Sequence, residues 1–417
     1  MNAKMRIVTL LLLIFIFAGS LFSQDLVEWR GSKRTGVYPD KNLMKSWPEN
    51  GPQLILELIN IGNGYSSAVV SNGKIFVTGR KDTLDVLSSY NQDGSKNWEI
   101  AYGRAWNRTF PEARCTPTVE NNRIYVVSGM GEISCVEATS GKSIWKIDAN
   151  AKYKGEPNKW GIAESLAISE KAVFYVTGGE ETSVIALDKN SGKLIWKTKS
   201  LGGTRAYASP VIIENAGLRL LLAQTANDLL AVNIENGEIA WNFNLVKYHS
   251  GETGKGGNTN TPLYYNDEIF ITSGYNHSAI MLSLAADGKS VSVKWINPDF
   301  DDHLGGVVKV GDYIFGSNWT NNSNGNWICA DWNTGKTMYE TKWFNKGPII
   351  SADGMLYCQE EKSGNLALVK PNPEKFDVVS SFKIEKGIGP YWAHPAIYDG
   401  KLFVRHGENL MVYDLKN

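Results

Sequence analysis

The chain has 417 residues, and its 43 lysines and arginines equal its 43 aspartates and glutamates. This balance gives no global electrostatic field that would favour nucleic acid or an anionic membrane, although a local basic patch is compatible with it. The length would accommodate two or three ordinary domains, so the organisation of the chain has to be inferred from its pattern.

The first two dozen residues have the composition of an export signal. A basic start precedes an apolar run from Val8 to Gly19, and small residues follow. Because this run is shorter than a typical membrane-spanning helix, we expect a signal peptide over residues 1–23. Cleavage after Ser20 fits the small-residue rule, and cleavage after Ser23 is the alternative. No cysteine precedes Cys115, so we expect no lipid anchor and a secreted or periplasmic mature protein.

One short sequence recurs along the rest of the chain: a polar turn with Gly and Lys leads into a strand that ends in tryptophan. The clearest copies are Ala138–Trp145, Leu187–Trp196 and Asn236–Trp241, and looser copies end at Trp98, Trp295 and Tyr339. These aromatic residues are 47, 51, 45, 54 and 44 residues apart. Such a period, built from short strands and tight turns, is typical of a radial β-repeat. We expect the tryptophans to bury their rings between neighbouring repeats and not to form a cofactor site.

Each repeat divides into four antiparallel strands. In the second unit the strands are predicted over 116–120, 123–128, 132–137 and 143–147, joined by tight hairpins. The same pattern begins again near Ser67, Ser165, Ser209, Thr261, Gly306, Gly347 and His394. The sequence therefore predicts eight inner strands.

The last unit lacks an outer strand of its own. Strands are predicted over 395–398, 401–405 and 409–414. We expect Gln53–Leu58 to supply the missing outer strand and close the ring, because an open sheet edge would otherwise remain. Residues 24–417 are thus predicted to form one all-β domain, an eight-bladed β-propeller of four-stranded antiparallel blades.

The Gly-Lys-x-x-Trp endings and the Pro-x-(apolar) inner strands resemble the PQQ-binding-like, eight-bladed β-propeller family. Quinoprotein alcohol dehydrogenases and the outer-membrane assembly lipoprotein belong to that family. The segments Trp29–Val37 and Gly64–Ser67 resemble a secreted bacterial branch of it. The resemblance covers essentially all of the mature chain. Since the matching motifs are structural, it implies the fold and leaves the activity open.

Four cysteines are few for an exported protein, and they form no C-x-x-C pair. They are Cys115, Cys135, Cys329 and Cys358. We expect buried free thiols, and at least one disulfide is the alternative.

Polar and aromatic residues gather in the loops that lead into the inner strands, which in a propeller surround one mouth of a central channel. The candidate ligand-binding residues are Arg114, Trp160, Glu164, Arg205, Asn260, His303, Trp392 and His394. One interpretation is a pocket for an anionic or planar ligand, since arginine pairs with carboxylates and tryptophan offers a stacking face. The other is that arginine and glutamate pair with each other while the amides cap strand ends.

The resemblance implies a more specific alternative. Quinoprotein enzymes hold PQQ over a tryptophan, bind its carboxylates with arginine and place Ca²⁺ beside a Glu, an Asn and a catalytic Asp. Arg114, Glu164 and Asn260 match these parts, with Trp160 or Trp392 below the ring. Against it, the sequence has no adjacent cysteine pair, is much shorter than those enzymes and offers no assignable catalytic aspartate.

Three aspartates beside His303 form a second candidate cluster. Asp299, Asp301 and Asp302 supply hard oxygen ligands that suit calcium, but the spacing lacks the glycine and terminal glutamate of an EF-hand. A solvated acidic loop is the favoured interpretation, and a calcium site is the alternative.

A complete structural repeat without a complete catalytic set predicts a monomeric binding or scaffold module. It would offer its channel mouth to a protein partner of the cell envelope or to a small anionic or planar ligand. A PQQ- and calcium-dependent alcohol or polyol dehydrogenase is one alternative, and a carbohydrate-binding propeller is another. Enzymatic activity stays open, with its absence favoured, and neither nucleic-acid binding nor a membrane span is expected.

Overall fold

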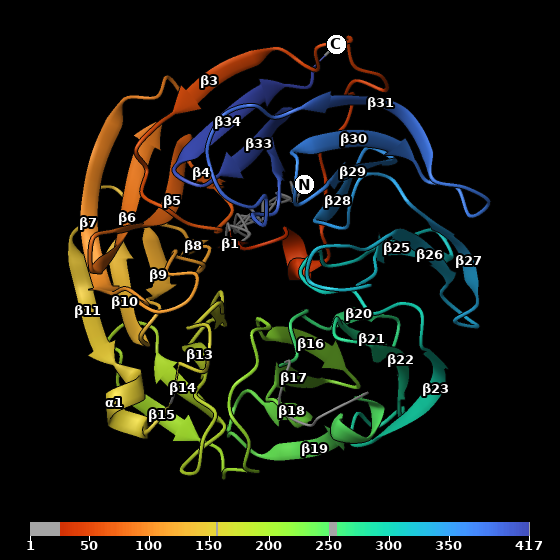
Figure 1. The fold of residues 1–417 in the computed structure, drawn as a ribbon. Helices are drawn as coiled ribbons and strands as arrows, with labels where there is room; N and C mark the ends of the chain where they lie inside the picture. Colours follow the sequence, from red (N-terminus) through yellow and green to blue (C-terminus); the bar gives the residue numbers. More distant parts are fainter. Residues whose placement is uncertain (1–25, 156, 250–256, 417) are drawn as a thin grey trace, which may run out of the picture.

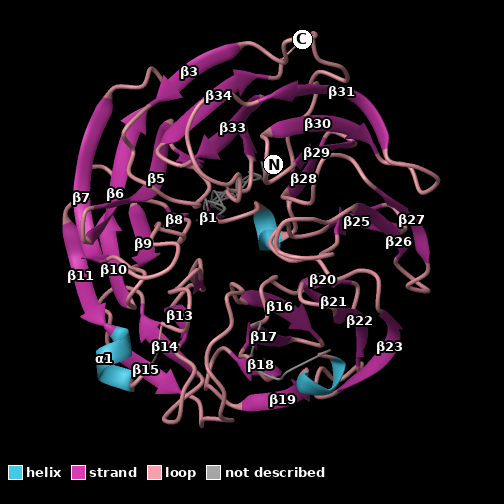
Figure 2. Cartoon of the chain, in the orientation of Figure 1, coloured by secondary structure: helices cyan, strands magenta, loops and turns pink. Residues whose placement is uncertain are grey.

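The computed structural model describes residues 26–155, 157–249 and 257–416, so the predicted signal peptide lies outside the described residues. Eight sheets are arranged as blades around a common axis (Figure 1). Strands and loops make up nearly all of the described chain, with one short α-helix and two 3-10 turns (Figure 2). The eight-bladed propeller predicted from the sequence is confirmed.

We number the blades in chain order and give each from its inner to its outer strand. Blade 1 contains β4 (Val69–Ser71), β5 (Lys74–Lys81), β6 (Leu84–Asn91) and β7 (Lys96–Arg104). Blade 2 contains β8 (Thr118–Glu120), β9 (Arg123–Val127), β10 (Glu132–Glu137) and β11 (Ser143–Asp148). Blade 3 contains β12 (Ala167–Ile168), β13 (Ala172–Val176), β14 (Val184–Asp188) and β15 (Leu194–Lys197). Blade 4 contains β16 (Val211–Asn215), β17 (Leu218–Gln224), β18 (Asp228–Asn233) and β19 (Ile239–Asn244).

The second half of the ring repeats this plan. Blade 5 contains β20 (Leu263–Tyr265), β21 (Glu268–Ser273), β22 (His277–Leu284) and β23 (Val291–Asn297). Blade 6 contains β24 (Val308–Val310), β25 (Tyr313–Ser317), β26 (Trp327–Asp331) and β27 (Thr337–Thr341). Blade 7 contains β28 (Ile349–Ala352), β29 (Met355–Gln359), β30 (Asn365–Lys370) and β31 (Asp377–Lys383). Blade 8 contains β32 (Ala396–Tyr398), β33 (Lys401–His406), β34 (Asn409–Asp414) and, from the N-terminal part of the chain, β3 (Leu54–Leu58).

Short elements complete the chain. They are β1 (Leu26–Val27), β2 (Val37–Tyr38), α1 (Ala149–Tyr153) and the 3-10 turns η1 (Ser32–Arg34) and η2 (Val246–Tyr248). Within the described residues no helix is long and apolar enough to cross a membrane. All four cysteines are buried and free, which confirms the expected thiols.

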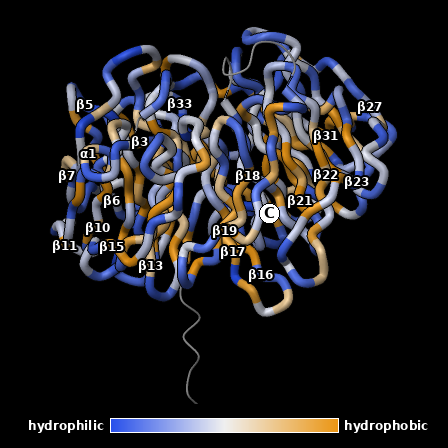
Figure 3. Tube along the Cα trace, turned by 90° about the horizontal axis from the view of Figure 1, so that it is seen from below, coloured by the Kyte–Doolittle hydropathy of each residue, from blue (hydrophilic) through white to orange (hydrophobic). Residues whose placement is uncertain are grey.

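The antiparallel order of each blade sorts the loops onto two faces. Connections from an outer strand to the next inner strand, and from the second to the third strand, lie on one face, which we call the mouth face. The other two hairpins of each blade lie on the opposite, back face. Hydrophobic residues concentrate along the strands between the two faces (Figure 3).

The recurring Gly and Trp are two halves of one contact between successive blades. Trp145 Nε1 donates a hydrogen bond to the Lys189 carbonyl of blade 3 at 2.9 Å. Gly192, in the same back-face turn, has a φ of +67°, and a Cβ there would lie 2.7 Å from the Trp145 ring. The same packing joins Trp98 to Gly141, Trp196 to Gly237 and Trp295 to Gly335. The predicted burial between blades is therefore confirmed for Trp145, Trp196 and Trp295, whereas the Trp98 ring is half-buried.

The same contact continues across the closure of the ring with other residues in place of tryptophan. β3 pairs antiparallel with β34, which confirms the predicted closing strand. Leu56 of β3 contacts Gly94 of blade 1, and the Phe382 ring of blade 7 covers Gly51, which precedes β3. Residues 51–58, which include β3, thus supply both halves of the inter-blade contact to blade 8.

The substitution Gly192→Ala is expected to destabilise the fold more than Gly354→Ala. Both glycines have positive φ, so either alanine costs about 1–2 kcal/mol of backbone strain. Only at Gly192 would the new methyl group meet a tryptophan ring, which adds roughly 1–3 kcal/mol of overpacking, because nothing lies within 4 Å of the corresponding position at Gly354. Urea unfolding of the two variants measures the difference. Equal losses of unfolding free energy would contradict the assigned contact.

Candidate ligand site at the mouth of the ring

A cavity of about 120 Å³ lies on the mouth face at the centre of the ring. Four of the predicted residues line it: Arg114, Asn260, Trp392 and His394. Aromatic walls come from Trp29, Tyr65 and Tyr207 together with Trp392. Loops of several blades therefore converge here, as the sequence predicted. Whether these residues bind a ligand stays a prediction.

A relay of hydroxyl groups holds the inner ends of the first five blades together. Each hydroxyl accepts a hydrogen bond from the backbone N–H of the corresponding residue one blade earlier. The bonds run from Ser67 to Thr116 (2.9 Å), Thr116 to Ser165 (3.1 Å), Ser165 to Ser209 (2.9 Å) and Ser209 to Thr261 (3.1 Å). The recurring Ser or Thr at the start of each inner strand has this structural cause.

Arg30 takes over this task in blades 6 to 8. Its guanidinium donates to the carbonyls of Ile349 (2.9 Å), Gly305 (3.3 Å) and Val307 (2.5 Å) and lies 2.8 Å from His394 Nδ1. Burial lowers the pKa of Arg30 to about 10, so the group still carries its charge at neutral pH. One buried cation thus replaces the hydroxyl relay.

Arg30 belongs to a segment that crosses the inside of the ring, residues 26–38, which we call the strap. Its strand β1 pairs with β8 of blade 2, and its strand β2 pairs in parallel with β28 of blade 7. Between them, η1 lies inside the ring (Figure 1), and Arg34 donates to the Leu166 carbonyl of blade 3 at 2.9 Å. Sequence analysis missed Trp29 and Arg30 as site residues. A tryptophan-arginine pair in a short segment outside the repeat was the available signal.

Glu164 and Arg205 pair with each other inside the protein. Their side chains are at most 1% exposed, and Arg205 Nη2 lies 2.5 Å from Glu164 Oε2. The carboxylate also accepts from the Val176 N–H at 3.3 Å, and Arg205 donates to the Tyr175 hydroxyl at 2.6 Å. Burial raises the pKa of Glu164 to about 7, and Arg205 opposes that rise. Of the two interpretations given by the sequence, a ligand pocket or pairing of arginine with glutamate, the pairing holds for Glu164 and Arg205.

Asn260 is engaged with Asp302. Its Nδ2 donates to the Asp302 backbone carbonyl at 2.6 Å and to the carboxylate at 3.1 Å, and its Oδ1 accepts from the Gly306 N–H at 3.1 Å. The Asp302 carboxylate accepts further bonds from the N–H groups of Gly305 (2.9 Å) and Ser317 (3.1 Å). Burial raises the pKa of Asp302 to about 6. The Asp302 carboxylate therefore holds the backbone around Gly305 and Ser317 in place.

The expectation of a solvated acidic loop is wrong for two of the three aspartates. Asp302 is fully buried and Asp301 is 4% exposed, whereas Asp299 is exposed. Asp301 accepts from the N–H groups of Asn276 and Trp319, both at 3.0 Å, and burial raises its pKa to about 7. Unpaired loop N–H groups need acceptors, which explains the burial. Within the described residues, no three His, Cys, Asp or Glu side chains form a metal-binding group.

Aromatic side chains flank the cavity on one side as a connected group. Trp160 contacts Tyr207 at a ring-centroid distance of 5.3 Å and stacks with Tyr275 at 6.5 Å. Tyr275 in turn contacts His303 at 4.6 Å and Trp319 at 5.4 Å. Burial lowers the pKa of His303 to about 3, so the ring is neutral and serves as part of this wall.

A second aromatic group lies around Trp392. Its ring is 4.9 Å from that of Tyr65 and 5.2 Å from that of Phe110. His394, two residues on, is buried, with Nε2 2.8 Å from the Leu304 carbonyl. Burial and nearby Arg30 hold the pKa of His394 well below its usual value. His394 is therefore a neutral structural link.

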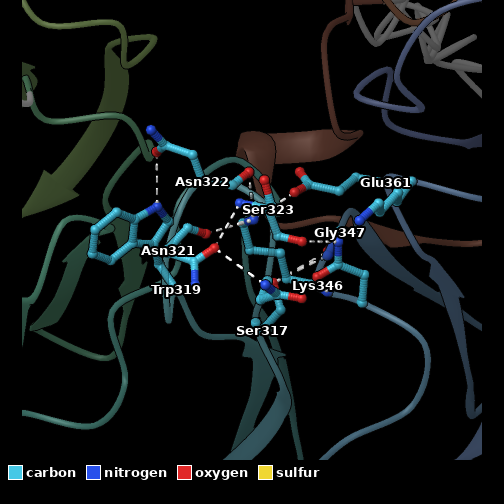
Figure 4. Close-up of polar contacts among 12 residues, drawn as sticks. Ser317, Trp319, Asn321, Asn322, Ser323, Lys346, Gly347 and Glu361 are labelled. Atoms are coloured by element: carbon cyan, nitrogen blue, oxygen red, sulfur yellow. Dashed lines mark hydrogen bonds and ion pairs between the residues drawn. The ribbon is translucent and has the colours of Figure 1, made fainter.

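Lys346 and Glu361 connect the two groups (Figure 4). The buried Lys346 ammonium lies 2.5 Å from Glu361 and donates to the carbonyls of Asn321 (3.2 Å) and Asn322 (3.3 Å). Glu361 also accepts a hydrogen bond from Trp392 Nε1 at 3.1 Å. This ion pair therefore fixes both Trp392 and the loop that follows Trp319.

Comparison with known proteins assigns the chain to a family. The sequence profile described as "Outer membrane protein assembly factor BamB" matches residues 84–341. The chain belongs to this PQQ-like β-propeller family. The BamB protein of Moranella endobia is 24% identical over 267 residues, which are 61% of this chain and 64% of that protein. The quinoprotein alcohol dehydrogenase PedH of Pseudomonas putida is 25% identical over 199 residues, 45% of this chain and 32% of that enzyme.

Solved structures agree with the PQQ-like fold. BamB from Moraxella catarrhalis has a TM-score of 0.65 at 13% identity and covers 87% of this chain and 99% of its own. A europium-containing methanol dehydrogenase has a TM-score of 0.62 at 11% identity, with coverages of 90% and 88%. At these identities the likeness shows the fold alone. The match covers about a third of the length of the PedH enzyme and just under two thirds of the length of the BamB protein.

The residues of this PQQ-like propeller do not fit the quinone and calcium of the dehydrogenases. A calcium ion needs six to eight oxygen ligands, but the Glu164 carboxylate is held by Arg205, and the Asn260 oxygen is held by Gly306. The 120 Å³ cavity is also smaller than the roughly 300–1,000 Å³ typical of small-molecule pockets. An internal cation, Arg205, thus occupies the side of Glu164 that a metal ion would need.

The substitution Asp301→Asn is expected to flatten the pH dependence of stability. Because burial raises the Asp301 pKa from 3.8 to about 7, the folded state takes up an extra proton below pH 7. This group's contribution to stability should therefore grow, by up to about 1.4 kcal/mol per pH unit, as the pH falls from 7 towards 4. Urea unfolding at pH 5, 6, 7 and 8 measures the effect, with Asp299→Asn as the exposed control. Identical pH profiles of wild type and D301N would contradict the assignment.

Proposed function

We propose that this protein is an exported, non-catalytic binding module of the cell envelope that engages its partner or ligand through the mouth face. The supporting observation is the internal pairing of Glu164 and Arg205, which takes up the carboxylate that would hold calcium in a quinoprotein dehydrogenase. Arg114 and the aromatic walls remain at the cavity. The printed function of the BamB relatives, outer-membrane protein assembly, supports a protein partner in the envelope.

A face that binds needs exposed anchor groups, and the mouth face has them. Phe110, whose ring contacts that of Trp392, is 44% exposed. Ile388, in the loop that leads to Trp392, is 68% exposed. Aromatic and apolar side chains of this kind supply most of the energy at protein interfaces. The mouth face therefore combines a cavity with an apolar rim.

Site-specific photo-crosslinking in the native envelope tests the proposal. A photoreactive residue at Phe110 should capture one reproducible partner. The matched control is Tyr265, which is 47% exposed in a back-face hairpin, and it should not capture that partner. Equal capture from both positions, or no partner from Phe110, would overturn the proposal.

A carbohydrate ligand is the second candidate, favoured by the half-buried rings of Trp160 and Trp392 at the mouth. Aromatic faces with polar neighbours suit sugar rings. Glycan binding that is lost in both Trp160→Ala and Trp392→Ala, with no protein captured at Phe110, would favour it over the protein partner.

Addition of PQQ and Ca²⁺ is expected to give neither a tight complex nor dye-linked alcohol oxidation. The reason is that Arg205 occupies the acidic group that calcium would need. Equilibrium dialysis and dye reduction over a panel of alcohols and sugars measure the two effects, with a quinoprotein ethanol dehydrogenase reconstituted in parallel as the positive control. Stoichiometric quinone binding with turnover would contradict the proposed function.

A further inference from the structure

We infer that the mouth cavity is a blind cup for the carboxylate end of a ligand that approaches end-on. This inference rests on the proposed binding function and deepens it, because it names the chemical group that is bound and its direction of approach. It depends on three features: the floor of the cavity, the hydrogen-bond donors in its wall and the aromatic rings at its rim.

The strap forms the floor. Trp29 lines the cavity and contacts the His394 ring edge-on at a centroid distance of 5.0 Å. The next residue, Arg30, bonds to blades 6, 7 and 8, and the strap pairs with blades 2 and 7 at its two ends. Backbone therefore crosses the ring below the cavity, so an extended chain cannot thread through the ring. A ligand has to present an end.

Within the described chain, the residues that line the cavity offer one positive charge and no carboxylate, although Glu112 and Asp85, outside the lining, interact electrostatically with Arg114. Among the described residues that line the cavity, Arg114 alone is charged at neutral pH and none is acidic. His394 is neutral, and its two nitrogens face Arg30 and the Leu304 carbonyl. Arg114 donates through Nη2 to the Phe110 carbonyl, while its buried Nη1 has no hydrogen-bond partner. The guanidinium therefore has donor capacity to spare, and an anionic acceptor would use it.

The hydroxyl relay adds further donors. Ser165 Oγ accepts from the Thr116 N–H and Ser209 Oγ accepts from the Ser165 N–H, so each relay bond uses a lone pair and leaves the O–H free to donate. Both serines line the cavity, and neither hydroxyl donates to an acceptor within the described part of the chain. Thr259, also in the wall, has a buried hydroxyl without a partner. A carboxylate accepts up to four such bonds, which an uncharged carbonyl group cannot match.

The rim determines the rest of the ligand. A cavity of about 120 Å³ holds a head group and little more. Tyr207 and the mutually contacting Tyr65 and Trp392 all line the cavity, so the adjoining part of the ligand contacts aromatic rings. The geometry suits a carboxylate attached to a planar or apolar group, with the remainder of the molecule projecting from the mouth face.

Titration of the mature protein with N-acetyl-tryptophan and N-acetyl-tryptophanamide tests the head group. The acid should bind at least tenfold more tightly than the amide, because charge-assisted hydrogen bonds to a carboxylate are stronger than hydrogen bonds to a neutral amide. The substitution Arg114→Gln should abolish this preference. The control Arg108→Gln removes a charge from the same loop, where Arg108 is exposed over the Trp106 ring and outside the cavity, and should keep it.

The floor is tested by Trp29→Ala and by the milder Trp29→Phe, each first checked for folding by its thermal unfolding. Trp29→Ala should weaken binding of the acid at least tenfold, and Trp29→Phe should weaken it less. If Trp29→Ala fails to fold, a folded Trp29→Phe must still show weaker binding. Unchanged affinity in a folded Trp29 variant would overturn the assigned floor.

A carboxylate of this kind has two sources, and a hexapeptide with a free C-terminal tryptophan distinguishes them. Tighter binding of the peptide than of N-acetyl-tryptophan assigns the cup to a polypeptide C-terminus, and equal binding assigns it to a small free acid. Equal binding of acids and amides, or no binding of any probe, would overturn the inference. The crosslink from Phe110 would then still show separately whether the mouth face binds a partner.

Discussion

The structure depends on the closure of the ring by two parts of the chain that are far apart in sequence. β3 pairs with β34, so the outer strand of blade 8 comes from the N-terminal side. Arg405 on β33 strengthens the same seam, because its buried guanidinium donates to the carbonyls of Thr78 in blade 1 (2.6 Å) and of Gly62 just before that blade (2.7 Å). Burial lowers the pKa of Arg405 to about 9. Without this seam, both end blades would expose sheet edges and apolar surface to water.

Residues 26–58 link closure to the site. The strap provides the floor of the mouth cavity, and β3, which follows it, completes the last blade. Stability and the shape of the cavity are therefore set by one continuous segment. The repeated Gly–Trp contacts involve back-face turns and are separated from the mouth by the length of the strands. The repeat can accordingly stay regular while the mouth loops differ from blade to blade.

The structural features that recur in every repeat could be predicted from the sequence. Tryptophans such as Trp145 and Trp196 recur with their glycine turns, because every blade boundary poses the same packing problem. At the seam, Leu56 and Phe382 solve that problem with other residues, so the pattern gave no tryptophan there. The closing strand was still predictable, since the last unit lacked one strand and one strand preceded the first unit.

The site was only partly predictable. The loops around Arg114 and Trp392 were expected at one mouth, and they line one cavity. The pairing of Glu164 with Arg205 stayed open in sequence, because two loops of different blades determine it. Asp302 looked like a surface group in a polar loop, and only the fold shows that it caps buried N–H groups. Arg30 lies outside the repeat and has no counterpart in the blades. Its partners are about 300 residues away in sequence, so no local pattern could reveal them.

Hydrogen exchange of the native protein measures most directly whether residues 26–58 are an integral part of the ring. The N–H of Gly36 is bonded within the strap, and that of Asp414 is bonded to the Gln53 carbonyl just before β3. If the strap and seam are integral, these amides exchange only through global unfolding, with the same protection as the central strands β9 and β29. Rapid exchange of the strap and seam while β9 and β29 remain protected would contradict the account.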